Sequence, residues 1–523
     1  MPKQQTDYLI DLIKRLTKAE KRSFRLFANR QNSKDDKLFM VLFDFIEGNE
    51  SYDEDTLLQK YSQIRKVQLS NIKANLYKQL LTNLRLLYRN SINDINTREL
   101  IDFAKVLHAK GMYKASLDVL YKAKQVAYAN EETSLAYVAV EFERVIENQY
   151  ITGSMSEKAE EIELESRDII TSLSRNNEFA NLSLRLYGLY LKYGYVKDSK
   201  ESMLISEFFN SHMPTFQLKN LNFYDKTYLY QSYIWYYNML QDFANNYKYC
   251  QKWVDMFDSE REMIENNMTL YIKSLHNILS ATFMANRADK FSFNFQKLEK
   301  IEEEYGPKFL INDQSVYLLV KNVHLLNQIF LTGQYRKGVD RLKDLEILVE
   351  DNTLEWDVNR IIVFNYKLAC VHFGADNHGR CIDFLNAIIN APVVNVRNDI
   401  QCFARILNLI AHYELGNDVL IRYQIKSVYR FLSKMEELHS VQREIFAFLR
   451  KLPNIKPLQM KVAFKKLRAN LMKMKDDPYE RRAFLYLDII SWLDSKIEEK
   501  TIEEVIQSKI AMSKIGQKNA NAT

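Results

Sequence analysis

The sequence predicts an all-α protein made of successive helix pairs, and three observations support this fold class. The 523 residues include only 12 Gly and 7 Pro, and long stretches without either residue favour helix over strand and turn. Hydrophobic residues make up 47% of the chain, with 32 Tyr and 29 Phe, so an extensive core can form. The third observation is a regular spacing of glycines between amphipathic runs.

Six glycines each end one amphipathic run and open the next: Gly111, Gly153, Gly194, Gly333, Gly374 and Gly416. The steps within the two groups of three are 42, 41, 41 and 42 residues. The longer gap between Gly194 and Gly333 fits three further steps if Gln241 and Asn286 take the turn position. A period in the forties made of paired helical runs is typical of a stacked solenoid. We therefore expect an α-solenoid of about eight antiparallel helix hairpins with helical N- and C-terminal caps.

Residues 1–95 are expected to form a basic N-terminal helical segment. Residues 7–30 fit two short amphipathic helices, and Thr17 with Glu20 has the spacing of a capping box at the start of the second. Three further helical patterns cover residues 37–48, 53–61 and 67–88.

Two interpretations of this segment remain open. It can cap the solenoid, or its last two helices can form a helix-turn-helix that offers Lys66, Lys73 and Lys78 to a DNA groove. The turn between these helices lacks glycine, which favours the cap.

Residues 96–440 are expected to form the solenoid. Two of its turns share a pattern of glycine, an aromatic residue two positions on and a small residue three positions later, and the first of them adds another small residue further on. A small residue there lets two helices cross closely. The matching positions are Gly111, Tyr113, Ser116 and Ala123 in the first hairpin, Gly333, Tyr335 and Gly338 in a later one, and Cys381, Pro392 and Leu415-Gly416 in partial matches.

This pattern resembles the tetratricopeptide repeat family, although that family repeats every 34 residues and this chain repeats about every 44. The resemblance implies a superhelix of antiparallel helix pairs whose concave face binds peptides or protein segments. It implies no catalytic residue.

Residues 441–500 are expected to form a C-terminal helical cap, followed by a short end helix and a disordered tail in residues 501–523. The cap contains a basic amphipathic helix over residues 458–475. One of its faces carries Met460, Phe464, Leu467, Leu471 and Met474, and an adjoining face carries Lys461, Lys465, Arg468 and Lys475. The basic face could bind nucleic acid phosphates, an anionic membrane surface or an acidic protein, or it could simply be solvated.

The net charge of +6 is concentrated at the two ends of the chain. Residues 1–34 carry nine Lys/Arg against three Asp/Glu, and residues 450–482 carry eleven against three. The remainder is mildly acidic, unlike a uniformly basic nucleic-acid-binding protein.

The sequence contains no motif for catalysis or for a cofactor. A phosphate-cradling glycine loop, a nucleophile elbow and an H-E-x-x-H pattern are all missing, so we expect no enzyme activity and no cofactor. Cys370, His372, His378 and Cys381 resemble a zinc-ligand set, but the first two lie about 200° apart around a helix. We therefore expect no metal site, and reduced, buried cysteines.

The aromatic run over residues 224–240 is the candidate contact region. Its Tyr230, Tyr233 and Tyr237 could anchor a partner, or they could pack between repeats. No signal peptide or membrane-spanning stretch is recognised, so a cytoplasmic location is expected.

The leading functional interpretation is a non-enzymatic helical-repeat scaffold or adaptor that binds a protein or peptide segment. One alternative is a transcriptional regulator with N-terminal DNA-binding helices and a TPR-like sensor. Another is an RNA- or ribosome-associated factor that uses the basic ends. The oligomeric state is left open.

Overall fold

The structure is a computed structural model, and it confirms the all-α fold class. It describes residues 3–30, 34–149, 155–196, 198–351, 356–391, 398–433, 440–475 and 488–520, together with 477, 480 and 484. Helices account for 85% of the chain, and the described residues contain no strand. The expected number of elements is wrong, because about 26 helices replace the eight hairpins within these residues.

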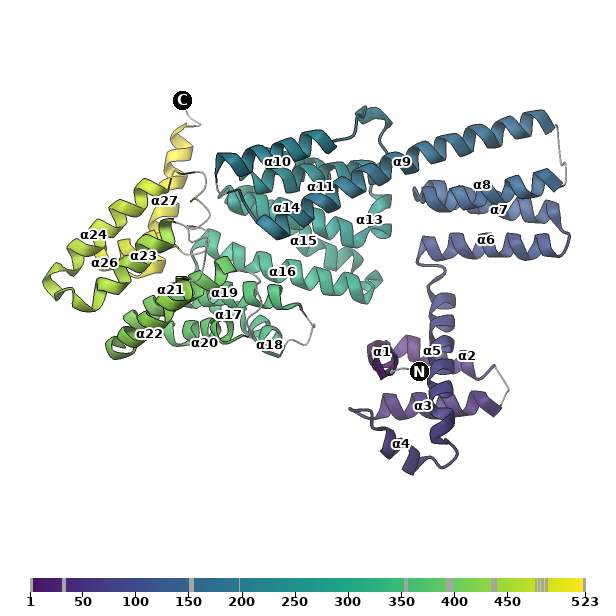
Figure 1. Cartoon of the computed structure of the whole chain (residues 1–523), viewed down its shortest axis with the longest axis horizontal. Helices are drawn as coiled ribbons and strands as arrows, with labels where there is room; N and C mark the ends of the chain where they lie inside the picture. The colour runs from purple at the N-terminus through teal and green to yellow at the C-terminus, as the bar shows by residue number, and fades with distance from the viewer. Residues whose placement is uncertain are drawn as a thin grey trace. The chain divides into compact units, whose positions relative to one another are not determined.

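The chain divides into two compact units, Met1–Arg175 and Asn176–Thr523 (Figure 1). The first unit contains α1 (Lys3–Arg15), α2 (Lys18–Ala28), α3 (Lys34–Gly48), α4 (Glu54–Lys60), α5 (Lys66–Tyr88), α6 (Asn93–Ala109), α7 (Tyr113–Ala129), α8 (Thr133–Gln149) and the first half of α9 (Met155–Tyr193). The domain boundaries expected from the sequence stay predictions.

The N-terminal helices α1 to α5 share one core. Phe24 and Phe43 are fully buried in it, with ring centroids 5.0 Å apart. The capping box at the start of α2 is confirmed: the Glu20 N–H donates to Thr17 Oγ1 (3.2 Å), and the Thr17 N–H donates to Glu20 Oε2 (2.6 Å). These reciprocal bonds satisfy two backbone donors that would otherwise lack partners at the helix start.

Helices α6, α7 and α8 pack as successive neighbours around a second core. The small residue at the crossing has the predicted role, since Ser116 is fully buried and its Oγ donates to the Ala104 carbonyl oxygen (2.7 Å). In the second unit Asn246 makes the equivalent bond to the Ile234 carbonyl oxygen (2.9 Å), again 12 residues away. A short polar side chain therefore joins the two helices of a pair at their crossing.

One expected hairpin is a single helix. The sequence predicts a pair of helices between Gly153 and Gly194. The structure instead has a single helix there, α9, which continues for 39 residues without a break. No proline occurs in it, and its one glycine, Gly188, is close to its end. The polar stretch at residues 174–178 therefore has nothing that would stop a helix. Gly153 itself lies outside the described residues.

The second unit continues the series of short helices. Its first half contains α10 (Ser199–His212), η1 (Leu218–Asn220), α11 (Phe223–Met239), α12 (Phe243–Ser259), α13 (Glu262–Asn266), α14 (Met268–Met284), α15 (Ala288–Tyr305), η2 (Gly306–Lys308) and α16 (Ile311–Thr332). Its second half contains α17 (Tyr335–Arg341), α18 (Lys343–Asp351), α19 (Val358–Gly374), α20 (His378–Ile389), α21 (Asn398–Glu414), α22 (Asp418–Leu432), α23 (Ser440–Lys451), η3 (Leu452–Asn454), α24 (Pro457–Met474), α26 (Ile489–Glu498) and α27 (Ile502–Ala520). Helix α27 covers most of residues 501–523, where the sequence predicts a short end helix and a disordered tail.

Left-handed residues mark the turns of this series. Gln241 and Asn286, which the sequence places at turn positions that hold glycine elsewhere, have positive φ angles of 57° and 51°. The turn after α19 differs, because the left-handed residue is Asp376 (φ 62°) and not Gly374. An Asp or Asn tolerates this backbone region better than most side chains do. Gly374 must therefore have another role.

Gly374 is a packing residue. A Cβ atom at this position would lie 2.5 Å from Cδ1 of Tyr335, closer than real carbon contacts allow. Gly338 is similar, since a Cβ there would lie 2.8 Å from Ile329. Both glycines let neighbouring helices approach closely.

The last helix returns to an earlier turn. A Cβ at Gly333 would lie 2.8 Å from Ile506 of α27, and Gln507 Nε2 donates to the Gly333 carbonyl oxygen (3.3 Å). The backbone N–H of Arg336 donates to a Glu503 carboxylate oxygen (3.1 Å). The turn between α16 and α17 is thus covered by residues about 170 positions later in the chain.

Candidate partner-binding site

Three tyrosines form a stack on the pair α11 and α12. Tyr233 and Tyr237 lie one turn apart on α11, and Tyr249 faces them from α12. The rings of Tyr233 and Tyr249 are nearly parallel, with centroids 4.0 Å apart and planes 7° apart. Tyr237 lies 5.7 Å from Tyr249 at 15°. We call these three residues the tyrosine stack; each is half-buried, so part of each ring faces solvent.

The hydroxyl groups of Tyr237 and Tyr249 stay protonated donors at neutral pH. Burial, and then the proximity of the Tyr233 and Tyr237 hydroxyls, raises the pKa of Tyr249 above its usual range. Burial likewise raises the pKa of Tyr237. The ammonium groups of Lys248 and Lys252 lie 5.8 and 5.3 Å from the Tyr249 ring centroid. The surface therefore combines aromatic area with neutral and cationic donors, which suits carbonyl and carboxylate oxygens.

The third predicted tyrosine has a different position. Tyr230 is only 8% exposed and belongs to the core that α11, α12 and α14 share. Its ring centroid lies 6.4 Å from that of Tyr249, with the ring planes tilted by 45°. Tyr230 is therefore almost inaccessible to a partner, whereas Tyr249, which the sequence reasoning missed, is half-exposed. Tyr249 was missed because it lies on the partner helix, outside the aromatic run.

The predicted basic residues of α24 separate into two groups. Lys461 pairs with Glu499 (3.0 Å), and Arg468 pairs with the buried carboxylate of Asp494, which Lys509 also contacts (2.7 Å). These two cations are engaged within the fold.

The other two predicted cations, Lys465 and Lys475, are exposed and have no carboxylate partner among the described residues. The sequence reasoning missed Lys466 and Lys473, which are also exposed and unpaired within that set. The buried face is as expected, since Phe464, Leu467 and Leu471 are at most 3% exposed.

The lysines suggested for a helix-turn-helix are not all available. Lys73 is only 5% exposed, pairs with Glu54 at 3.0 Å and lies over the ring of Tyr52. A side chain held in this way cannot reach a phosphate without breaking those contacts. Lys66 and Lys78 remain exposed on α5.

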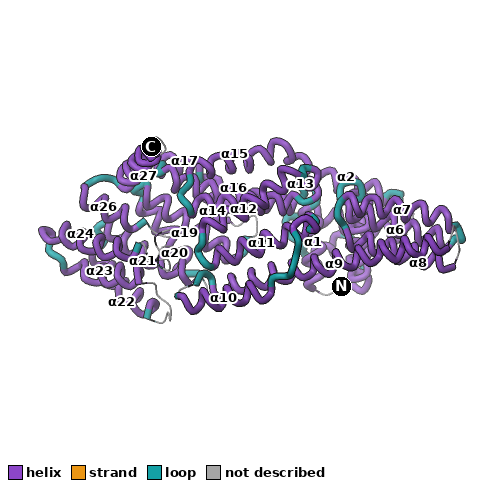
Figure 2. The backbone as a smooth tube through the Cα atoms, turned by 90° about the horizontal axis from the view of Figure 1, so that it is seen from above, coloured by secondary structure: helices purple, strands orange, loops and turns teal. Residues whose placement is uncertain are grey.

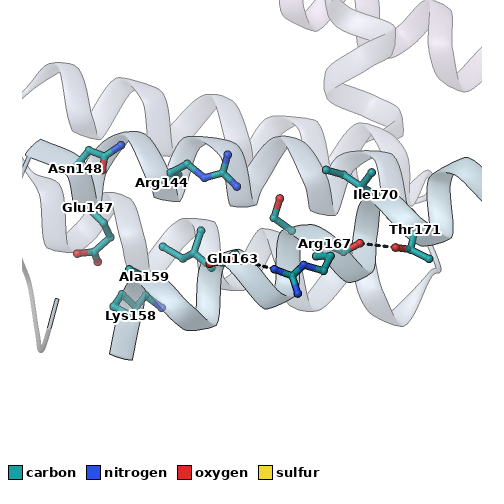
Figure 3. Close-up of a pocket in the computed structure, with 11 residues that line it drawn as sticks. Arg144, Glu147, Asn148, Lys158, Ala159, Glu163, Arg167, Ile170 and Thr171 are labelled. Carbon is teal, nitrogen blue, oxygen red and sulfur yellow. Dashed lines mark hydrogen bonds and ion pairs between the residues drawn. The ribbon is translucent and has the colours of Figure 1, made fainter. Parts of the chain in front are cut away.

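A groove in the first unit is a further concave feature that the sequence did not indicate. It lies between α8 and α9, has a volume of about 500 Å³ and is lined mainly by apolar surface (Figure 3). Its cations are engaged: Arg144 pairs with Glu141, Lys158 with Glu143 and Arg167 with Glu163. The groove therefore offers no free charge to orient a ligand.

The cysteine and histidine residues that resembled a zinc site take part in hydrogen bonding and packing between helices. His372 Nε2 lies 2.9 Å from a Glu346 carboxylate oxygen, and its ring stacks on Phe384. Cys381 is fully buried at the small-residue position of its helix pair. All four cysteines are free thiols, three of them buried and Cys370 half-buried. No group of three potential metal ligands occurs among the described residues.

None of the helices in the described ranges is both long and apolar enough to cross a membrane. Comparisons of the chain with protein-family models, with curated proteins and with solved structures give no match.

Proposed function

We propose that this chain is a non-enzymatic helical-repeat scaffold, similar in kind to tetratricopeptide-repeat proteins, that binds an extended protein segment on the tyrosine stack. The single observation that carries the proposal is the half-exposed, parallel arrangement of Tyr233, Tyr237 and Tyr249. Sequential helix packing and the recurring left-handed turn residues support a solenoid-like arrangement.

The chemistry of the stack favours a peptide with acidic residues. Ring faces supply apolar area at a low cost in side-chain entropy, and protonated hydroxyls donate to backbone carbonyls. Lys248 and Lys252 add positive charge beside the rings, which favours carboxylates over cations. A core of aromatic anchors surrounded by polar groups is the usual composition of a binding hot spot.

The test is photo-crosslinking combined with affinity purification from native lysate. A photoreactive phenylalanine analogue placed at Tyr237 should crosslink a defined segment of a partner. A Tyr233→Ala/Tyr237→Ala variant should lose the same partner. A matched control, Tyr121→Ala/Tyr423→Ala, removes two tyrosines that are 62% and 79% exposed elsewhere and should retain it.

Two results would overturn the site assignment. One is an unchanged partner list for the double variant; the other is a crosslink that appears equally when the analogue replaces Tyr121. Loss of the partner on nuclease treatment would instead favour the RNA-associated alternative. A Tyr233→Phe/Tyr237→Phe variant retains ring packing, so it separates loss of hydroxyl donors from loss of folding.

A further inference from the structure

The outward face of α24 combines exposed aliphatic side chains with unpaired lysines. Leu458 is 97% exposed, Val462 67% and Met472 37%. With the exposed Ala469 they follow the helical spacing of one stripe, opposite the buried face. Lys465 lies within this stripe, and Lys466 and Lys473 border it. Figures 1 and 2 both place α24 at an outer end of the second unit.

The charge of this helix is one-sided. Residues 456–475 contain seven Lys/Arg and no Asp/Glu. Only Lys461 and Arg468 are paired within the described residues, both with α26 or the residue that follows it. The wider stretch 419–475 carries fourteen Lys/Arg against three Asp/Glu. The excess of positive charge on α24 attracts an anionic partner.

We propose that α24 is a membrane-surface helix that docks the protein on an anionic lipid bilayer. In this arrangement Leu458, Val462 and Met472 enter the boundary between headgroups and acyl chains. The side chain of Lys465, within the stripe, and those of Lys466 and Lys473, beside it, extend to the lipid phosphates. Helix α24 then lies in the plane of the interface and does not span the membrane.

The aliphatic stripe decides between lipid and the other anionic partners. Nucleic acid would neutralise the lysines but would offer nothing to Leu458 and Val462, and single-strand binders use aromatic rings for stacking. The only aromatic residue of α24, Phe464, is 3% exposed and faces the core. A second copy of this chain is disfavoured because two cationic faces would repel each other.

The experiment measures co-sedimentation of the purified full chain with vesicles. Vesicles of phosphatidylcholine alone are compared with vesicles that also contain phosphatidylglycerol, at low and high salt. We expect binding to require the anionic lipid and to weaken as salt screens the charges. Each lysine near such a surface strengthens binding about fivefold, so Lys465→Gln/Lys466→Gln should reduce the partition coefficient roughly 30-fold.

The aliphatic residues are tested separately. Leu458→Gln/Val462→Gln leaves the charge unchanged and should reduce the partition coefficient by about tenfold or more, because the apolar area that enters the bilayer is lost. These side chains are exposed, so circular dichroism should show unchanged helix content. Two controls match the changes elsewhere: Lys114→Gln/Lys122→Gln for charge, and Leu184→Gln/Met203→Gln for exposed apolar residues. Both controls should bind like the wild type.

Three outcomes would overturn the proposal. The first is no binding to anionic vesicles. The second is equal binding by the wild type and Leu458→Gln/Val462→Gln, which would show simple electrostatic adsorption. The third is that an RNA oligonucleotide or a poly-glutamate peptide binds the chain with the same dependence on Lys465 and Lys466 while the vesicles do not. Failure here leaves the tyrosine-stack proposal untouched, since the two surfaces lie on different helices.

Discussion

Replacing Gly374 by alanine tests whether the repeating glycines serve turn geometry or packing. Gly374 is the last residue of α19, and its backbone passes directly over the ring of Tyr335 at the start of α17. A Cβ would lie 2.5 Å from Cδ1 and 2.6 Å from Cγ of that ring. Tyr335 is 5% exposed in the core cluster, so the ring cannot move into solvent.

The expected loss of stability follows from these distances. The ring or the helix must shift by close to 1 Å, and overpacking of this kind costs about 1–3 kcal/mol. Alanine recovers at most about 1 kcal/mol through its better helix propensity. We expect Gly374→Ala to lower the free energy of unfolding by about 1–2 kcal/mol.

Urea unfolding followed by tryptophan fluorescence measures this change, because Trp356 and Trp492 lie in the same core cluster as Tyr335. A double-mutant cycle with Tyr335→Leu isolates the clash. The double variant should lose about 1 kcal/mol less than the sum of the single variants. Wild-type stability of Gly374→Ala, or strict additivity in the cycle, would refute the packing explanation.

Two other glycines provide matched controls. Gly416 has φ of 69°, and a Cβ atom there would meet nothing within 4 Å, so Gly416→Ala should cost about 1–2 kcal/mol through backbone strain alone. It should show no coupling to Tyr335→Leu. Gly188 lies within α9 in open space, and Gly188→Ala should stabilise the protein by about 0.5–1 kcal/mol.

Two further predictions concern buried polar groups. His276 Nδ1 and His324 Nε2 lie 3.0 Å apart, and burial lowers the pKa of His276 to about 4, so the folded state favours its neutral form. The free energy of unfolding should therefore fall as the pH decreases from 6.5 towards 4. Urea unfolding at pH 6.5 and pH 5 should show that His276→Asn loses about 1–2 kcal/mol less of this free energy between the two pH values than the wild type does. Identical pH dependence of the two proteins would contradict this prediction. Lys124 contacts Glu143 (2.7 Å) and Glu165 (2.8 Å), and Lys124→Met should cost about 3 kcal/mol in thermal or urea unfolding because both carboxylates lose that cation. Adding Glu143→Gln to Lys124→Met should recover part of the loss, and a further drop instead would show that the pairing is not the cause.

Local patterns in the sequence predicted much of the secondary structure. The capping box at Thr17, the helix over residues 458–475 with its buried apolar face, and the turn positions at Gln241 and Asn286 were all predictable. Each depends on residues within a few positions of one another, where helical period and capping chemistry act directly. The same reasoning failed for α9, where it predicted a helix pair. Whether a polar stretch such as residues 174–178 interrupts a helix depends on the packing of the helical segments on either side of it, which the local sequence does not show.

The candidate site was only partly predictable, because it depends on contacts between residues on different helices. The aromatic run indicated Tyr233 and Tyr237, but neither the burial of Tyr230 nor the arrival of Tyr249 from α12 could be read from spacing. The same holds for α24, where Glu499 pairs with Lys461, Asp494 pairs with Arg468, and Lys465 is left exposed.

The sequence by itself determined the helical class, the turn positions at Gln241 and Asn286 and the amphipathic face of α24, since each is encoded by neighbours along the chain. Only the tertiary structure decided which side chains remain free to act. Tyr335 against Gly374, α27 against Gly333 and Asp494 against Arg468 join residues 26 to about 170 positions apart. Such contacts depend on which helices pack against each other. The hydrophobic periodicity of a helix shows which of its faces can be buried, but not which neighbouring helix covers that face.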